Sequence, residues 1–197
     1  MTAAQADLAR ARPASSGEFP GIPEDLTIDA PRVEDGAAIW RIARDSGTLD
    51  LNSSYSYLLW CRDFAATSAV ARRTADGEPA GFITGYIRPE RPRTLVVWQV
   101  AVDRPHRGRG LAAALLESLV ARVARETAGP GGPAGAAGIT EIETTVTPGN
   151  TASNRLFASF AARHGAGVER KVLFDGGLFP ESGHDPEVLH RIGPLTH

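Results

Sequence analysis

The sequence is poor in cysteine and lysine and contains no long apolar run. Cys61 is the only cysteine among 197 residues, which excludes an internal disulfide and a cysteine-ligated zinc cluster and favours a reducing environment. No apolar run approaches the roughly 20 residues that span a membrane, and the residues after Met1 lack the apolar segment of a signal peptide. We therefore expect a cytoplasmic protein without a membrane partner.

Several well-known site motifs are missing as well. Lys171 is the single lysine, so there is no Gly-Lys-Ser/Thr P-loop, and neither G-x-G-x-x-G nor the G-x-S-x-G elbow of acyl hydrolases occurs. The five histidines show no metal-ligand spacing, so we expect no metal. The formal net charge of -2 lacks the basic excess of a nucleic-acid-binding surface, and we expect no nucleic-acid partner.

The composition is that of one globular domain, and the two ends of the chain and one internal loop differ from it in composition. A hydrophobic content of 42% in 197 residues suits a single domain with a sizeable core. Residues 1–25 are rich in Ala, Pro, Ser and Gly and predict a disordered tail. Residues 26–193 form the predicted domain, with residues 128–138 as a flexible loop inside it and residues 194–197 as a second tail.

Hydrophobic periodicity predicts strands and helices that alternate along the chain. Strand patterns occupy residues 26–28, 67–73, 79–87, 95–102, 139–145, 170–174 and 188–192. Helical patterns occupy residues 33–44, 53–64, a stretch from 111 onward, and 151–164. Asp76-Gly77 predicts a hairpin between two of the strands. The order indicates an α/β fold whose helices flank one sheet.

The most informative stretch runs from Trp98 to Leu116. An apolar strand is followed by the basic turn Arg107-Gly108-Arg109-Gly110, and a helix with an apolar stripe begins at Leu111. The first turn of a helix has N–H groups without internal partners, and its dipole makes that end partly positive, so a phosphate fits there. A tight turn with exposed arginines is the alternative interpretation of the same residues.

Arg107-x-x-Gly110-x-Ala112, following Val100–Asp103, resembles the pyrophosphate loop of the GNAT acetyltransferase superfamily. The resemblance implies the GNAT fold, with a mixed, mostly antiparallel sheet, and acetyl-CoA as co-substrate. It implies that the preceding strand splays from its neighbour and pairs with the pantetheine arm. The cofactor-binding residues implied in this way are Val100, Val102, Arg107, Gly108, Arg109, Gly110, Leu111, Ala112, Asn150, Asn154 and Phe157.

The helix after Asn150 departs from the superfamily pattern at one position. In many members a tyrosine there donates a proton to the leaving thiolate, whereas this chain has Phe157, which lacks a hydroxyl. Tyr55, Tyr57 or no dedicated acid remain as alternatives. Asn150 is either a cofactor contact or a plain helix cap.

Several blocks also resemble the L-2,4-diaminobutyrate acetyltransferases of ectoine biosynthesis, a family within the superfamily. They are Leu49–Ser53 with two following tyrosines, Val97–Val102, Glu143–Pro148, Asn150–Ser153, and Leu178–Pro180 with Gly183-His184 and Pro186-Glu187. The resemblance implies transfer of acetyl to the γ-amine of the diamine by direct attack, and it implies a homodimer.

A substrate with two ammonium groups and one carboxylate needs acidic partners. Asp50 is the first candidate, with Asp185 or Glu187 as the second, and Asn52 is a further candidate for binding the substrate. Trp98 offers a face for a cation–π contact with the substrate, and Tyr55 is a second candidate substrate contact. The candidate catalytic residues are Tyr55, Tyr57 and Trp98.

The general base stays open at this point. A water held by Asp50, Glu141 or Glu143 is one alternative, and a tyrosine is another. Three other functions also stay open. They are a GNAT-fold module that binds or senses acyl-CoA without turnover, an acetyltransferase for another small amine, and one for protein N-termini.

Overall fold

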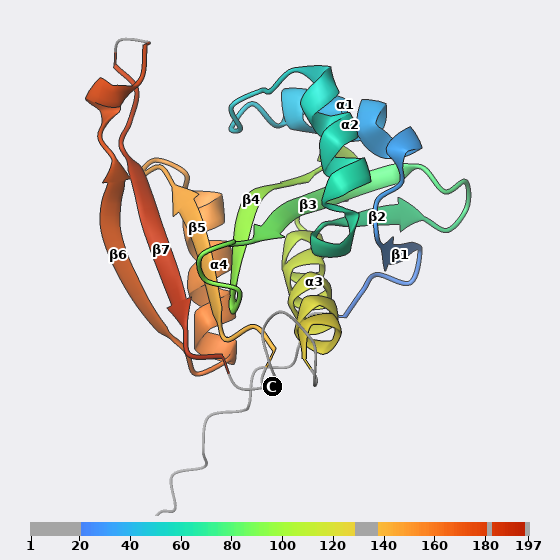
Figure 1. Ribbon diagram of the computed structural model, residues 1–197. Coiled ribbons are helices and arrows are strands. Elements are labelled where there is room, and N and C mark those ends of the chain that lie inside the picture. The colour runs from blue at the N-terminus through green and yellow to red at the C-terminus, as the bar shows by residue number, and fades with distance from the viewer. Residues whose placement is uncertain (1–20, 129–137, 181–182, 196–197) are drawn as a thin grey trace, which may run out of the picture.

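The computed structural model describes residues 21–128, 138–180 and 183–195. One seven-stranded sheet with the order β1-β2-β3-β4-β5-β7-β6 forms the centre (Figure 1). Its strands are β1 (Leu26–Asp29), β2 (Ala69–Arg73), β3 (Pro79–Ile87), β4 (Thr94–Val102), β5 (Glu141–Val146), β6 (Gly167–Phe174) and β7 (Glu187–Gly193). The helices are α1 (Gly36–Ser46), α2 (Ser54–Asp63), α3 (Leu111–Thr127) and α4 (Thr151–Arg163).

The sheet is mixed and mostly antiparallel, which confirms the predicted fold class. Only β4 and β5 pair in parallel, and the other neighbours pair antiparallel. The final strand β7 lies between β5 and β6, and β6 begins at Gly167, three residues before the predicted start. β6 is therefore an edge strand, and most of its residues are exposed.

Two apolar clusters lie on opposite faces of the sheet. The helices α3 and α4 bury one cluster, which includes the predicted stripe Leu111, Leu115, Leu116, Leu119, Val120 and Val123. The helices α1 and α2 bury the other, which includes the predicted face Ile39, Ile42 and Ala43 together with Tyr57 and Phe82. The amphipathic period of each helix thus matches the face that it covers.

A β-bulge in β4 decides which side chains reach the site. Thr84 pairs with Gln99 while Gly85 pairs with Val97, so Trp98 is one residue extra on its strand. Alternation along a strand would put residues 95, 97, 99 and 101 on one face. The bulge moves the residues after Trp98 to the opposite faces. Val97 packs with the α3/α4 cluster, whereas Ala101 packs with the α1/α2 cluster.

β4 and β5 also separate beside this bulge. Their parallel pairing covers Thr94–Val97 against Glu141–Thr144 and stops there. From Trp98 to Val102 the edge of β4 that faces β5 has no ladder partner among the described residues. The predicted splay is therefore present, and it leaves a strand edge free for a ligand.

The predicted tails and loop fall largely outside the described residues. This holds for residues 1–20 of the first tail, for residues 129–137 of the loop and for residues 196–197 of the second tail. Within the described part, Asp25 pairs with Arg109, and Leu195 is buried in the core. No helix in the described ranges is long and apolar enough to cross a membrane.

Candidate active site

A cavity of about 320 Å³ lies where β4 splays, between the N-terminal ends of α3 and α4. Seven of the predicted cofactor-binding residues line it, namely Val100, Val102, Arg107, Gly108, Leu111, Ala112 and Asn150. Ser46, Thr48 and Ser153 add hydroxyl groups to its wall. We refer to this cavity as the cofactor groove.

The turn before α3 presents unpaired N–H groups at this groove. Ala114 N–H donates the first hydrogen bond of α3 to Gly110 O, so the earlier amides have no partner within the helix. Gly108 and Gly110 both have a φ of +75°, a conformation that favours glycine. The Nε atom of Arg107 donates to Val102 O over 2.9 Å, which ties the turn to the end of β4.

The other four predicted cofactor residues lie elsewhere. Arg109 turns to Asp25 and forms a two-pronged ion pair with it, with one N–O distance of 3.0 Å. Gly110 is the N-cap of α3 and does not line the groove. The amide of Asn154 donates to Asn150 O and Thr147 O, and Phe157 is 2% exposed within the core. In the structure these four residues therefore stabilise the turn, the two helices and the core, and they do not line the groove.

Asn150 serves as the helix cap that the sequence left as one alternative. Its Oδ1 atom accepts from Ser153 N–H over 3.0 Å. The residue also lines the cofactor groove, so capping and a cofactor contact are compatible.

Three side chains from two distant segments meet at Asp50, two residues after Thr48 in the wall of the groove. Asp50, His184 and Glu187 each place one ligand atom so that the three atoms lie within 4.8 Å of one another. Asp50 Oδ2 is 3.8 Å from His184 Nε2. The sequence predicted the two carboxylates, whereas it did not predict His184 as part of the site. We refer to these residues as the acidic trio.

The hydrogen bond between His184 and Asp185 O fixes the tautomer that the neutral His184 ring adopts. Its Nδ1 atom lies 2.6 Å from Asp185 O, and a carbonyl can only accept, so Nδ1 carries the hydrogen. The ring is stacked on Phe179 with a centroid distance of 3.7 Å, which fixes its plane. In the neutral ring Nε2 then presents a lone pair toward the two carboxylates.

Other predicted site residues occupy different environments. Tyr57 is 1% exposed and its hydroxyl donates to Gln99 Oε1, whereas Tyr55 is 64% exposed. Trp98 is 51% exposed, stacks on Trp60, and lines a separate cavity of about 410 Å³. The amide of Asn52 lies 3.5 Å from Asp50 O, at the limit of a hydrogen bond. The Asp185 carboxylate approaches Gly149 and is outside the trio.

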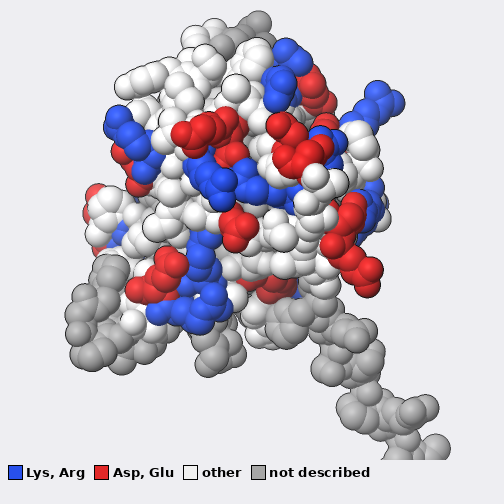
Figure 2. Space-filling model, turned by 90° about the vertical axis from the view of Figure 1, so that its right-hand side faces the viewer, with Lys and Arg blue, Asp and Glu red and all other residues white. Residues whose placement is uncertain are grey.

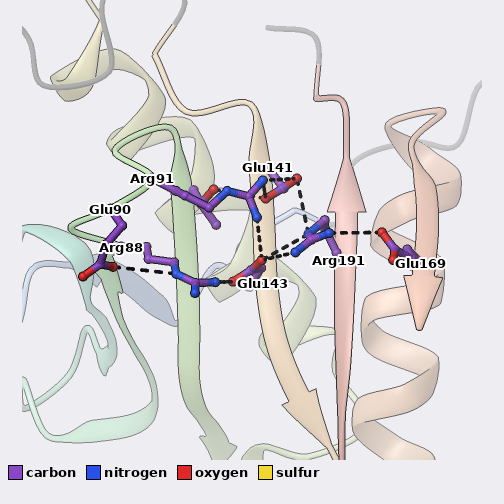
Figure 3. Close-up of polar contacts among 8 residues, drawn as sticks. Arg88, Glu90, Arg91, Glu141, Glu143, Glu169 and Arg191 are labelled. Carbon is purple, nitrogen blue, oxygen red and sulfur yellow. Dashed lines mark hydrogen bonds and ion pairs between the residues drawn. The ribbon is translucent and has the colours of Figure 1, made fainter. Parts of the chain in front are cut away.

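Glu141 and Glu143 are held in an ion network (Figure 3). Arg88, Arg91 and Arg191 all reach Glu143, and the first of these contacts is 2.6 Å long. Burial alone would raise the pKa of Glu143, but the hydrogen bonds from Arg88 and Arg191 lower it below its usual value. A carboxylate held in this way is a weak base, which argues against Glu143 as the group that activates an amine.

Charge on one face of the molecule is mixed in sign. On the side of the molecule that carries β1, β2 and the turn after β2, basic and acidic side chains lie next to one another (Figure 2). The ion pair Arg73–Asp76, at the end of β2 and in the turn after it, is an example of such neighbours.

Comparison with known proteins decides the family. The model of the acetyltransferase (GNAT) family matches residues 37–161, which include the splayed strand and the basic turn. The chain belongs to the GNAT acetyltransferase family. This confirms the resemblance seen in the sequence, and it agrees with the sheet order and the cofactor groove.

Two similar proteins are named as diaminobutyrate acetyltransferases. A chain from Streptomyces avermitilis called L-2,4-diaminobutyric acid acetyltransferase is 64% identical over 197 residues, covering 100% of both chains. A diaminobutyrate acetyltransferase from Paenibacillus lautus was solved with its substrate L-2,4-diaminobutyric acid and coenzyme A. It matches with a TM-score of 0.75 and 36% identity, covering 87% of this chain and 96% of the other.

A more distant solved structure shares the fold alone. The ribosomal-protein-S18-alanine N-acetyltransferase from Escherichia coli matches with a TM-score of 0.64 at 16% identity, covering 87% of this chain.

Proposed function

We propose that the chain transfers the acetyl group of acetyl-CoA to the γ-amine of L-2,4-diaminobutyrate, giving N-γ-acetyldiaminobutyrate. The observation that carries the proposal is the acidic trio beside the cofactor groove. Asp50 O accepts from Gln99 Nε2 over 2.9 Å, and the next residue of β4, Val100, lines the groove. An amine bound near Asp50 is therefore close to the strand along which the thioester arm would lie.

The spacing of the trio suits an ammonium group. Acceptors held about 2.8 Å from a tetrahedral nitrogen lie roughly 4.6 Å apart. The trio offers one atom from each of its three residues, all within 4.8 Å of one another, and an ammonium has three N–H donors. Ligands around a tetrahedral zinc ion would lie closer, roughly 3.3 Å apart. The Asp50–His184 distance of 3.8 Å lies between these two values, so the spacing accommodates either occupant, and the activity with and without EDTA distinguishes them.

The relatives support the substrate. The Streptomyces avermitilis protein bears the same activity in its name over the whole length of this chain. The Paenibacillus lautus protein binds both L-2,4-diaminobutyric acid and coenzyme A.

The reaction needs a neutral amine and no covalent enzyme intermediate. The γ-ammonium first loses a proton, its nitrogen bonds to the acetyl carbonyl carbon, and the carbon–sulfur bond breaks. A second proton leaves the nitrogen and one proton reaches the sulfur of coenzyme A. Burial raises the pKa of the Cys61 thiol to about 11, so this cysteine is not available as a nucleophile. Direct attack is therefore the route that the residues support.

Thiol release measures the proposed activity. With acetyl-CoA, we expect L-2,4-diaminobutyrate to stimulate release of the coenzyme A thiol far more than ornithine or lysine, in the presence of EDTA as well as without it. Preference for a longer diamine would refute the substrate. Coenzyme A binding without amine-stimulated release would favour the alternative of an acyl-CoA binding module.

We further propose that the enzyme is a cytoplasmic homodimer. The exposed residues Val172, Leu173, Phe174 and Leu178 place apolar surface on and just after the edge strand β6. Leu173 and Phe174 also line the cavity that contains Trp98, so this surface continues across the sheet. A second copy would remove it from water. Light scattering should give twice 20.8 kDa, and a mass of one chain would refute the dimer.

A further inference from the structure

We infer that Gln99 is a positioning residue. It holds residues 47–53, which we call the Asp50 loop, against β4, while Tyr57 fixes the orientation of the Gln99 amide. The inference rests on the proposed function, because it concerns how the Asp50 carboxylate is delivered to the substrate. Gln99 is 7% exposed and both ends of its amide are hydrogen-bonded.

The partners of Gln99 leave one orientation for its amide. Asp50 O is a carbonyl oxygen and only accepts, so the NH2 group of Gln99 must face it, at 2.9 Å. The amide oxygen then faces Tyr57, whose hydroxyl donates to it over 3.0 Å. The hydrogen of the Tyr57 hydroxyl is therefore engaged, which gives this buried tyrosine a supporting role in place of proton donation to the leaving thiolate.

The bulge at Trp98 places Gln99 on the face where this contact is possible. Without the extra residue, Gln99 would share the face of Val97 and point into the cluster under α3 and α4. With it, Gln99 lies on the side of Ala101 and Tyr57, under α1 and α2. An amide buried in the apolar cluster would lack partners, so the bulge and the glutamine depend on each other.

The Asp50 loop needs such a support. The residues between α1 and α2 form neither helix nor strand, and the side chain of Asp50 is 85% exposed. The N–H groups of Thr48 and Leu49 donate to Ser46 Oγ, at the C-terminal end of α1. Among the described residues, the bond from Gln99 is the one hydrogen bond that joins residues 48–53 to the sheet. Loss of this bond would let the Asp50 carboxylate move away from His184 and Glu187.

Gln99→Met tests the inference, because it keeps the length of the side chain and removes both hydrogen bonds without adding a charge. Binding of the diamine to the enzyme with coenzyme A is measured by calorimetry, so the result does not depend on turnover. We expect the Kd and KM for the diamine to rise about tenfold, near the upper limit for one neutral hydrogen bond. The Kd for coenzyme A should stay within about twofold.

Two further variants separate positioning from a general loss of structure. Tyr57→Phe should raise the diamine Kd in the same direction by less, and combining it with Gln99→Met should add little, because both act through one amide. In an Asp50→Asn background, Gln99→Met should also add little. The inference would be overturned if Gln99→Met weakened the binding of diamine and coenzyme A equally. It would also be overturned if the effects of Gln99→Met were additive both with Tyr57→Phe and with Asp50→Asn.

Failure of the inference is distinct from failure of the proposed function. If Asp50→Asn weakens diamine binding and Gln99→Met does not, the positioning role is wrong while the function stands. If the unmodified enzyme binds the diamine but releases no thiol, the function is wrong, and the calorimetry still decides the role of Gln99.

Discussion

Asp50→Asn is expected to weaken binding of the diamine by about 10- to 100-fold. The substitution keeps the shape of the side chain and removes the negative charge from the acidic trio, and a hydrogen bond to a charged group contributes about 1.5–3 kcal/mol. Because Asp50 does not line the cofactor groove, the affinity for coenzyme A should stay within about twofold. Steady-state kinetics with each substrate varied in turn measures both effects.

Asp63→Asn is the matched control for the loss of one carboxylate charge. Asp63 ends α2 and is paired with Arg62 at the surface, outside the trio and the groove. The kinetic constants of the Asp63→Asn variant should equal those of the unmodified enzyme. An equal loss of affinity for diamine and coenzyme A in Asp50→Asn would contradict the role that we assign to Asp50.

Asp35→Ala is expected to lower the free energy of unfolding by about 3–5 kcal/mol, as is typical when one partner of a buried ion pair is removed. Asp35 accepts two hydrogen bonds from the guanidinium of Arg72, one of them 2.6 Å long, and a third from Arg32 N–H. The side chains of Asp35 and Arg72 are 7% and 9% exposed, so the variant leaves a buried charge unpaired. For a chain of this length the midpoint of thermal unfolding should fall by roughly 6–20 °C.

The same pair predicts a dependence of stability on pH. Burial alone would raise the pKa of Asp35, but the hydrogen bonds from Arg72 and Arg32 lower it below its ordinary value of 3.8. A lowered pKa contributes stability that is present above the ordinary value and is lost as the pH falls through the value in the folded state. Between neutral pH and pH 3, the free energy of unfolding should fall less steeply in Asp35→Ala than in the unmodified chain.

Denaturant unfolding at several pH values measures both effects on Asp35. Asp63→Ala removes an exposed carboxylate that also pairs with an arginine, and it should leave the midpoint almost unchanged. Equal midpoints for Asp35→Ala and Asp63→Ala would show that the buried pair does not stabilise the fold.

Local signals in the sequence were sufficient to predict the helices and strands and many of the residues that line the cofactor groove. The strand, turn and helix from Leu95 to Leu116 follow from apolar periodicity and from two glycines, which act within a few residues. The same signals could not show that Arg109 would pair with Asp25, which lies 84 residues away in the chain. They also gave no reason to expect Phe157 in the core, since a phenylalanine on that helix suits a core or a groove equally.

The sequence by itself determined the order of strands and helices, the basic turn and the acidic residues available for an amine, because each depends on neighbouring residues. The tertiary structure alone decided that Asp50, His184 and Glu187 meet, since these residues come from segments more than a hundred positions apart. It also decided the face of Gln99, because a single extra residue at Trp98 reverses the alternation of β4. Register between strands is a property of the assembled sheet, and periodicity within one strand does not contain it.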